Sequence, residues 1–314
     1  MMSESPENLT AILQLLLTRG IGPKSLHKIM LRLEAMHTSP ADLVNRPASE
    51  ISRQFGLRLD LAEQVAGCKD ESLHLFEKLA QEEVQILPSS SDDYPVSLRT
   101  ILKDSAPPVL FVRGNRRLLS GPTVGFCGAR NASDRGLSVA NLLSELLGQH
   151  GFNVASGYAA GVDLAAHKSA LESGGTTTFV LSEGILRFKP KPEIAHLLSD
   201  QNFVVISQFL PQIPWEAHYA MQRNSTILGL SRGMVLVESG LSGGTFAAGE
   251  ECLKLGVPLF VVDYATPPSS AEGNSYFLGK GAIPLRNGRT SFDTLIEALR
   301  EDTKPPDQLK LSFG

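Results

Sequence analysis

The segment from residue 123 to residue 167 restricts the fold more than any other part of this 314-residue chain. An apolar run, Thr123–Cys127, ends at a glycine and is followed by a helical pattern, and a second run ending at Ser156 and Gly157 repeats this arrangement. Where a buried strand delivers small residues to a helix start, unpaired backbone N–H groups and the positive end of the helix dipole face outward. The segment therefore predicts two phosphate-binding turns in succession.

Strand and helix patterns alternate between residues 120 and 300. The strand candidates are Thr123–Cys127, Asn153–Ala155, Thr177–Leu181, Phe203–Ile206, Met234–Val237 and Leu259–Val262. The helical stretches between them are Leu137–Leu147, Leu164–Leu171, Glu193–Leu198, Thr226–Leu230 and Phe246–Leu255. Continuous apolar strands joined by helices are typical of a parallel sheet covered on both faces. We predict an α/β fold, an extended Rossmann-like, doubly wound and mostly parallel sheet, with its ligand crevice at the carboxyl ends of the strands.

The chain is expected to have three parts: a small helical domain over residues 1–80, the Rossmann-like domain over 81–300 and a flexible tail over 301–314. In the helical part, Gly20-Ile21-Gly22-Pro23 separates two apolar-striped helices, as in a helix-hairpin-helix or SAM-like domain. Two interpretations stay open: the turn amides hold a backbone phosphate, or the glycines only permit a tight turn. Residues 87–95 have the composition of a linker, and residues 106–114 are expected to form a short strand.

Composition limits the kind of partner that the chain can bind. The formal net charge is -4, so binding to nucleic acid would have to come from a local patch of positive charge. The three cysteines are too scattered for a zinc site, which favours buried, reduced thiols. The polar start is no signal peptide and no apolar run reaches membrane-spanning length, so we expect a cytoplasmic protein without a membrane partner.

Most polar candidates follow a predicted strand directly. A G-x-G-x-x-G fingerprint and a G-x-x-x-x-G-K-[ST] loop are both missing, which argues against a redox dinucleotide and against nucleoside triphosphate hydrolysis. Asp163 and His167 are four residues apart but too few for a metal site. We therefore expect Asp163 to cap the amides of its own helix and His167 to pack against the sheet. Glu183 and Glu238 are expected to be structural or to orient Arg130 and Arg223.

Several short motifs occur in the order that one family has them. They are Tyr94-Pro95, Pro107-Pro108, Gly128-Ala129-Arg130, Ser156-Gly157 with Gly161, Asp163 and His167, Gly184, Arg223-Asn224, Ser242-Gly243 and Gly273-Asn274. Through these motifs residues 85–285 resemble the DprA/Smf family of DNA-processing proteins. The resemblance implies a single-stranded DNA-binding protein that loads the recombinase RecA in natural transformation. It also implies a homodimer that is not an enzyme and needs no cofactor and no metal.

The resemblance carries phosphate-binding roles to individual positions. They are Arg130, Ser156, Gly157, Gly161, Arg223 and Asn224, and the glycine-rich rim adds Gly128, Ser242, Gly243, Gly244 and Thr245. Arginine forks and helix-start amides hold phosphates without reading the base sequence.

The chain departs from the family at two cationic positions, since Ala160 and Ser225 stand where arginines are usual. Each lost contact should weaken DNA binding and lower the salt dependence by roughly one unit. We expect no winged-helix domain after residue 300, and a divergent member could serve a neighbouring-gene partner, as in phage defence. The alternative function is a nucleotide-sensing or regulatory partner protein on the same fold. A nucleotide hydrolase using Glu183 or Glu238 as a base has little support.

Overall fold

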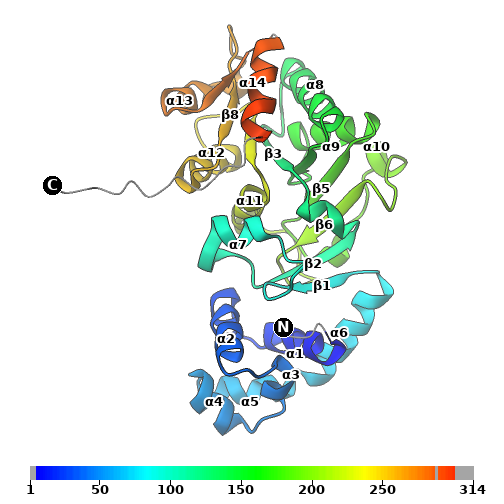
Figure 1. Ribbon diagram of the computed structural model, residues 1–314, viewed down its shortest axis with the longest axis vertical. Coiled ribbons are helices and arrows are strands. Elements are labelled where there is room, and N and C mark those ends of the chain that lie inside the picture. The colour runs from blue at the N-terminus through cyan, green and yellow to red at the C-terminus, as the bar shows by residue number, and fades with distance from the viewer. Residues whose placement is uncertain (1–4, 287–288, 301–314) are drawn as a thin grey trace, which may run out of the picture. The chain divides into compact units, whose positions relative to one another are not determined.

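The computed structural model describes residues 5–286 and 289–300 and confirms the α/β fold (Figure 1). In the described part of the chain, nine strands form one sheet in the order β1-β2-β6-β5-β4-β3-β7-β8-β9. Their bounds are β1 (Gln85–Pro88), β2 (Val109–Gly114), β3 (Thr123–Cys127), β4 (Asn153–Ser156), β5 (Thr176–Val180), β6 (Phe203–Ser207), β7 (Gly233–Leu236), β8 (Leu259–Val262) and β9 (Ile283–Leu285). The six strands expected from the sequence are present, and the tail predicted at 301–314 lies outside the described residues.

The chain divides into two compact units, each built from two separate segments. The first combines Met1–Ser120 with Thr178–Gly229, and the second combines Gly121–Thr177 with Leu230–Gly314. The first unit holds β1, β2 and β6, and the second holds β4, β3, β7, β8 and β9.

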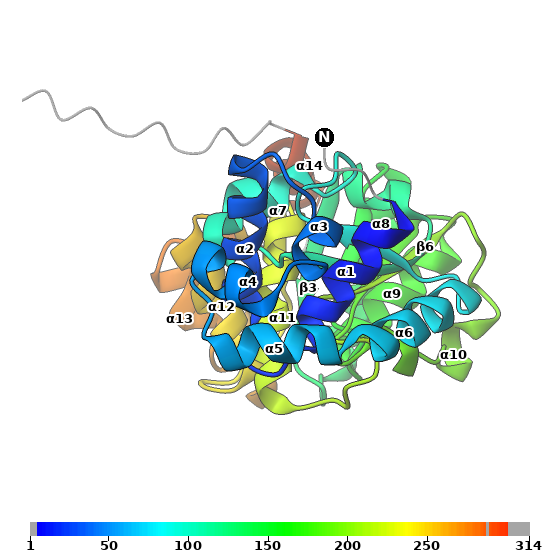
Figure 2. The same ribbon diagram turned by 90° about the horizontal axis from the view of Figure 1, so that it is seen from below.

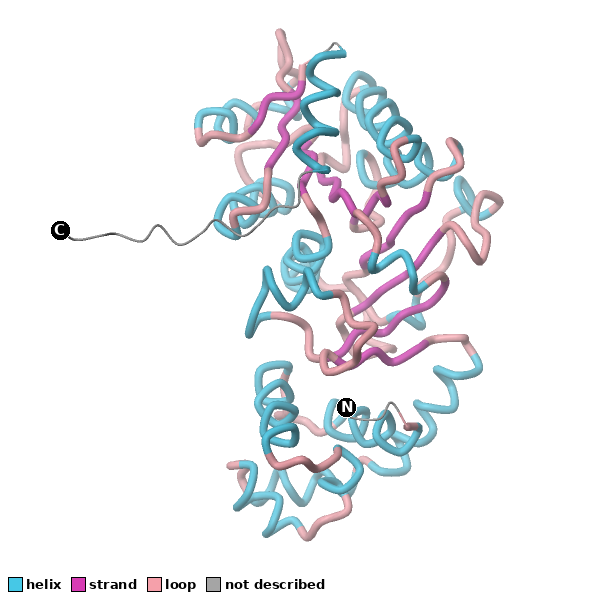
Figure 3. Tube along the Cα trace, in the orientation of Figure 1, coloured by secondary structure: helices cyan, strands magenta, loops and turns pink. Residues whose placement is uncertain are grey.

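Six helices form the N-terminal part of the first unit. They are α1 (Pro6–Leu17), α2 (Pro23–Ala35), α3 (Pro40–Val44), α4 (Ala48–Phe55), α5 (Leu59–Gly67) and α6 (Lys69–Gln81). Figure 3 draws this part of the chain without strands, and Figure 2 shows α1 among the other helices. Ile12, Leu13 and Leu15 of α1 are almost fully buried, so α1 supplies the core of this region. The turn between α1 and α2 includes Gly20 at φ +104, a conformation that favours glycine.

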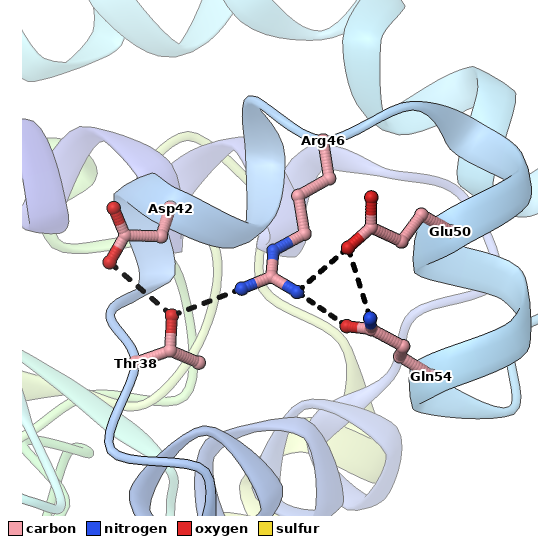
Figure 4. Close-up of polar contacts among 5 residues, drawn as sticks. All are labelled: Thr38, Asp42, Arg46, Glu50 and Gln54. Carbon is pink, nitrogen blue, oxygen red and sulfur yellow. Dashed lines mark hydrogen bonds and ion pairs between the residues drawn. The ribbon is translucent and has the colours of Figure 1, made fainter.

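A polar network joins α4 to the segment around α3 (Figure 4). The guanidinium of Arg46 forms an ion pair with Glu50 at 3.0 Å and also donates to Gln54, both on α4. Its other amino group donates to the Thr38 hydroxyl at 3.4 Å, and that hydroxyl donates to Asp42 at 3.3 Å. These groups are partly exposed, so the network orients the short helices more than it stabilises them.

The remainder of the first unit contains two antiparallel strand pairs. β1 pairs with β2, and β2 pairs with β6. Part of the predicted linker at residues 87–95 is therefore β1, because Leu87 and Pro88 pair with Leu110 and Val109. The helices here are α7 (Val96–Leu102), α10 (Pro192–Ala195) and α11 (Ala217–Leu230), with 3-10 turns η1 (Lys103–Ser105) and η2 (Arg116–Ser120).

The second unit contains the parallel strand pairs that are typical of a doubly wound sheet. The pairs β3–β4, β3–β7, β7–β8 and β8–β9 are all parallel. Its helices are α8 (Asp134–Gln149), α9 (Val162–Glu172), α12 (Gly244–Leu255), α13 (Asn274–Gly279) and α14 (Arg289–Arg300). α8 and α9 lie side by side (Figure 1), and Phe126, Val154, Val235 and Phe260 are fully buried in the core. β3 lies between β4 and β7, so the sheet changes direction of winding at β3, where such folds place their ligands.

Candidate functional site

The candidate site lies at the carboxyl ends of β3 and β7 in the second unit. The last residues of these strands, Cys127 and Leu236, are register partners, so the loops that follow emerge next to each other. The hydroxyl of Thr245, at the start of α12, donates to the Gly128 carbonyl oxygen at 3.0 Å. The loop after β7 therefore meets the loop after β3, as predicted from the sequence. We call these two loops, together with the loop after β4, the cradle.

The loops after β3 and β4 approach each other closely at Gly161. This residue has φ +75, and a Cβ atom there would lie 2.3 Å from the Ala129 carbonyl oxygen and 2.4 Å from that of Arg130. The Val162 N–H donates to the same Ala129 oxygen at 3.3 Å. A Cβ at Gly128 would lie 2.4 Å from Cγ2 of Val162. Both glycines are thus required by packing, and they fix the backbone of Arg130 against the start of α9.

Asp163 organises the loop after β4. Its carboxylate accepts hydrogen bonds from the N–H groups of Gly157 at 3.1 Å and Ala159 at 3.3 Å. The sequence prediction that Asp163 caps the amides of its own helix is corrected in this respect, because these bonds go to the preceding loop. A carboxylate of this protein already occupies the amide of Gly157, which the sequence assigned to phosphate binding. The loop is therefore ordered before any ligand arrives.

Two other predicted residues face the interior. Ser156 is fully buried and its hydroxyl donates to the Phe126 carbonyl oxygen at 2.7 Å, so its side chain supports the sheet. His167 is also fully buried, and its Nδ1 lies 2.6 Å from the Thr177 hydroxyl, which itself donates to Val154 at 2.8 Å. Because that hydroxyl uses its proton on Val154, Nδ1 of His167 carries a hydrogen and donates it. His167 packs against the sheet, as expected.

Of the residues to which the sequence assigned phosphate binding, the exposed ones are Arg130, Ser242, Gly243 and Gly244. Gly243 is the N-cap of α12, has φ +93 and supplies no side-chain cap to the helix. A Cβ atom at Gly243 or Gly244 would meet nothing within 4 Å, so the space in front of the helix start is open. A helix start of this kind attracts anions through its backbone N–H groups and its dipole.

Glu238, at the end of β7, is fully buried and has a structural role. It accepts from the Ser133 backbone N–H at 2.9 Å, from the Ser133 hydroxyl, from the Ser270 hydroxyl at 2.7 Å and from the Tyr264 hydroxyl at 3.4 Å. Ser133 is the N-cap of α8, so the carboxylate holds the start of that helix against the sheet. The sequence offered one signal for this, a serine before an acidic helix start.

Glu183 lies at the end of β5 and forms an ion pair with Arg187 at 3.6 Å. Partial burial raises the pKa of Glu183, and the positive charge of Arg187 opposes that shift. The contacts of Glu238 support the structural role expected for it. For Glu183 the structure gives the ion pair with Arg187, and orientation of Arg130 or Arg223 by either glutamate stays a prediction.

Arg223 and Asn224 lie in the first unit. The sequence placed them before a helix, which is wrong, because both are inside α11. Arg223 is 7% exposed and Asn224 is half-buried. The structure describes these residues on α11, and their phosphate-binding role stays a prediction.

Three features bear on the remaining predictions. Within residues 5–286 and 289–300, His, Cys, Asp and Glu side chains form no group of three that could hold a metal ion. Across the same part of the chain, every helix is too short or too polar to span a membrane. Cys127 and Cys252 are buried free thiols as predicted, whereas Cys68 is half-buried.

Comparison with known proteins identifies relatives over most of the chain. The model of the family "DNA recombination-mediator protein A" matches residues 85–299. DNA processing protein DprA of Streptococcus pneumoniae (strain ATCC BAA-255 / R6) is 30% identical over 76% of this chain and 86% of its own length. DprA of Bacillus subtilis (strain 168) is 28% identical over 77% and 84%. Protein Smf of Escherichia coli (strain K12) is 30% identical over 73% of this chain, which spans 63% of that protein.

Solved structures show the same fold. DprA from Streptococcus pneumoniae superposes with a TM-score of 0.73 at 24% identity, covering 90% of this chain and 95% of that one. DNA processing protein A from Helicobacter pylori, for which a single-stranded DNA binding mode is described, superposes with a TM-score of 0.59 at 23% identity, covering 68% and 96%. Because the family match extends over more than half of its residues, the chain belongs to the DNA recombination-mediator protein A family and is a DNA-processing protein of the DprA/Smf type.

Proposed function

We propose that this protein binds single-stranded DNA through backbone phosphates at the cradle. The observation that carries the proposal is the close approach at Gly161, which presents the exposed Arg130 on a fixed backbone. The start of α12, which has no side-chain cap at its N-cap residue Gly243, belongs to the same cradle. One guanidinium and one helix start can hold consecutive phosphates without contacting base edges, which suits a strand of any sequence.

The contacts of the carboxylates at the strand ends favour binding over catalysis. The carboxylates at the strand ends are buried or paired: Glu238 with hydroxyl and amide donors, and Glu183 with Arg187. A general base must reach the proton that it removes, and a fully buried Glu238 cannot do so without opening the fold. We therefore propose a binding protein that breaks no bond in the DNA, with Arg223 and Asn224 of α11 as further phosphate contacts.

The family description, a recombination mediator, supports a second part of the proposal. A protein that covers single-stranded DNA by its phosphates leaves the bases accessible to a recombinase. We propose that the protein passes the strand to RecA, or to a partner encoded beside it, and that it acts as a homodimer. The same proposal includes the biological setting, which is either natural transformation or defence against phage.

The test is a salt series of oligothymidine binding, followed by fluorescence anisotropy. Arg130→Ala should weaken binding about 10- to 150-fold, since a hydrogen bond to a charged group contributes about 1.5–3 kcal/mol. It should also reduce the slope of log K against log salt by about 0.7, the value for one phosphate of a single strand. Arg117→Ala removes an exposed arginine of η2, before the amino end of β3, and is the matched control. Equal behaviour of the two variants would contradict the proposal, and absence of binding at low salt would favour the nucleotide-sensing alternative.

A further inference from the structure

A pocket of about 500 Å³ lies within the first unit and shares no residue with the cradle. It is lined by the first turn of α2, the segment from η1 to β2, the residue after β6 and one face of α11. Pockets that bind small molecules usually enclose about 300–1,000 Å³ and combine apolar walls with a few polar groups. This pocket has that size and contains the helical turn that the sequence singled out and that the cradle does not use.

Hydrogen bonds hold the apolar wall in place. Pro107 and Pro108 form this wall, and both of their carbonyl oxygens are occupied. The buried Tyr94 hydroxyl donates to Pro107 at 2.7 Å, and the Ser89 backbone N–H donates to Pro108 at 2.8 Å. The two prolines are themselves largely buried, and their anchored carbonyls keep this apolar part of the pocket wall rigid.

The polar wall comes from α11 and from the end of β6. Gln222, Ser225 and Thr226 are spaced i, i+3 and i+4, so they lie on one face of α11. The Thr226 hydroxyl, 1% exposed, donates to the side-chain oxygen of Gln208. This bond fixes the amide of Gln208 with its NH2 group available, and within the described residues that group has no other partner. A fixed amide with an open donor, beside the second amide of Gln222, matches the donor and acceptor edge of a nucleobase.

The charges of the pocket are few and opposite. Lys24, in the first turn of α2, supplies one ammonium group, and Asp104 of η1 supplies one carboxylate. Neither side chain forms an ion pair with another described residue. One cation suits a single phosphate and is too little for a triphosphate, whereas a carboxylate can accept from the amino group of a base or from a sugar hydroxyl.

We propose that this pocket binds one nucleotide, with its base between the prolines and the amides and its phosphate at Lys24. The proposal does not depend on the cradle, because the residues of the two sites differ. The nucleotide is either a free nucleoside monophosphate or one residue of a bound DNA strand.

The test uses calorimetric titration of the full chain with deoxyadenosine monophosphate and with thymidine monophosphate. Saturable binding is expected, with about tenfold weaker binding for Gln208→Leu, which removes the fixed amide. Ser225→Arg should fill the pocket and abolish binding. Gln222→Ala and Lys24→Ala change exposed side chains, so they keep the fold while each weakens binding. Arg117→Ala is the control and should bind as the parent chain does. Absence of saturable binding, or equal binding by Lys24→Ala, Gln222→Ala and Arg117→Ala, would overturn the proposal.

A second comparison separates the two sources of the nucleotide. If the pocket takes one residue of a strand, an abasic oligonucleotide should bind about tenfold more weakly than oligothymidine of equal length, and Ser225→Arg should remove this difference. If the pocket takes a free nucleotide, both oligonucleotides should bind equally while the monophosphate still binds. The Arg130→Ala variant distinguishes the sites, because it should weaken the oligonucleotide and leave the monophosphate unchanged.

Discussion

Replacement of Gly161 by alanine tests the close approach on which the cradle depends. The new Cβ would lie 2.3 Å from the Ala129 oxygen and 2.4 Å from the Arg130 oxygen, far inside ordinary van der Waals contact. Both neighbours are backbone atoms, so they cannot rotate away as a side chain would. The residue also has φ 75 and ψ -128, a region that alanine rarely adopts.

Two penalties add to give the expected loss in the free energy of unfolding. Overpacking costs about 1–3 kcal/mol, and a backbone conformation that disfavours a side chain costs about 1–3 kcal/mol. We therefore expect Gly161→Ala to lower the free energy of unfolding by about 2–6 kcal/mol. The matched control is Gly174→Ala in the same unit, where φ is +79 and a Cβ would meet nothing within 4 Å. The control carries only the backbone penalty, about 1–2 kcal/mol.

The assay compares urea unfolding midpoints of the two variants, followed by oligothymidine binding in conditions where both are folded. Gly161→Ala should unfold at lower urea concentration than Gly174→Ala and should bind DNA more weakly, because the backbone of Arg130 is displaced. Equal midpoints for the two variants would refute the close approach as the element that fixes Arg130.

Three further predictions follow from the contacts of individual side chains. Asp163→Ala should lower the free energy of unfolding by about 1–3 kcal/mol, because two loop amides lose their acceptor; an unchanged urea midpoint would contradict this. Glu238→Gln should lower the free energy of unfolding by about 1.5–3 kcal/mol, since the carboxylate that accepts from Ser133 is replaced by an amide that must also donate. Thermal melting followed by circular dichroism measures this loss, and a melting temperature equal to that of the parent chain would contradict the role of Glu238 in holding the start of α8. Burial raises the pKa of the Cys252 thiol to about 12, so it stays neutral at pH 8. A thiol reagent should then modify the half-buried Cys68 first, and mass spectrometry showing native Cys252 modified first would exclude this.

The strands that could be predicted from the sequence are the ones with continuous apolar runs. β3 agrees with its prediction at both ends, Thr123 and Cys127. β1 and β9 were missed because each combines a short run with a proline, a residue that argues against a strand. Such short runs give no period, and only pairing with a neighbouring strand makes them strands.

The start of α11 could not be predicted for a different reason. Its buried apolar residues lie near its end, at Ile227 and Leu228, whereas the apolar residues of its first turns, such as Met221, are exposed or half-buried and follow no clear stripe. The periodic signal therefore began at Thr226, although the helix begins at Ala217. The prediction therefore placed Arg223 and Asn224 outside the helix.

The sequence by itself determined the fold class and the edge of the sheet where polar residues collect, because apolar strands and small residues at their ends are local patterns. Only the tertiary structure decided which of those residues remain available to a ligand. Ser156 bonds into the sheet and Glu238 bonds to the start of α8, because neighbouring strands bring these donors and acceptors together. Asp163 bonds to the amides of Gly157 and Ala159, because the loop after β4 folds back over the start of α9. A side chain with two possible partners takes the one that the packed neighbours place within reach, and the spacing of residues along the chain does not contain that information.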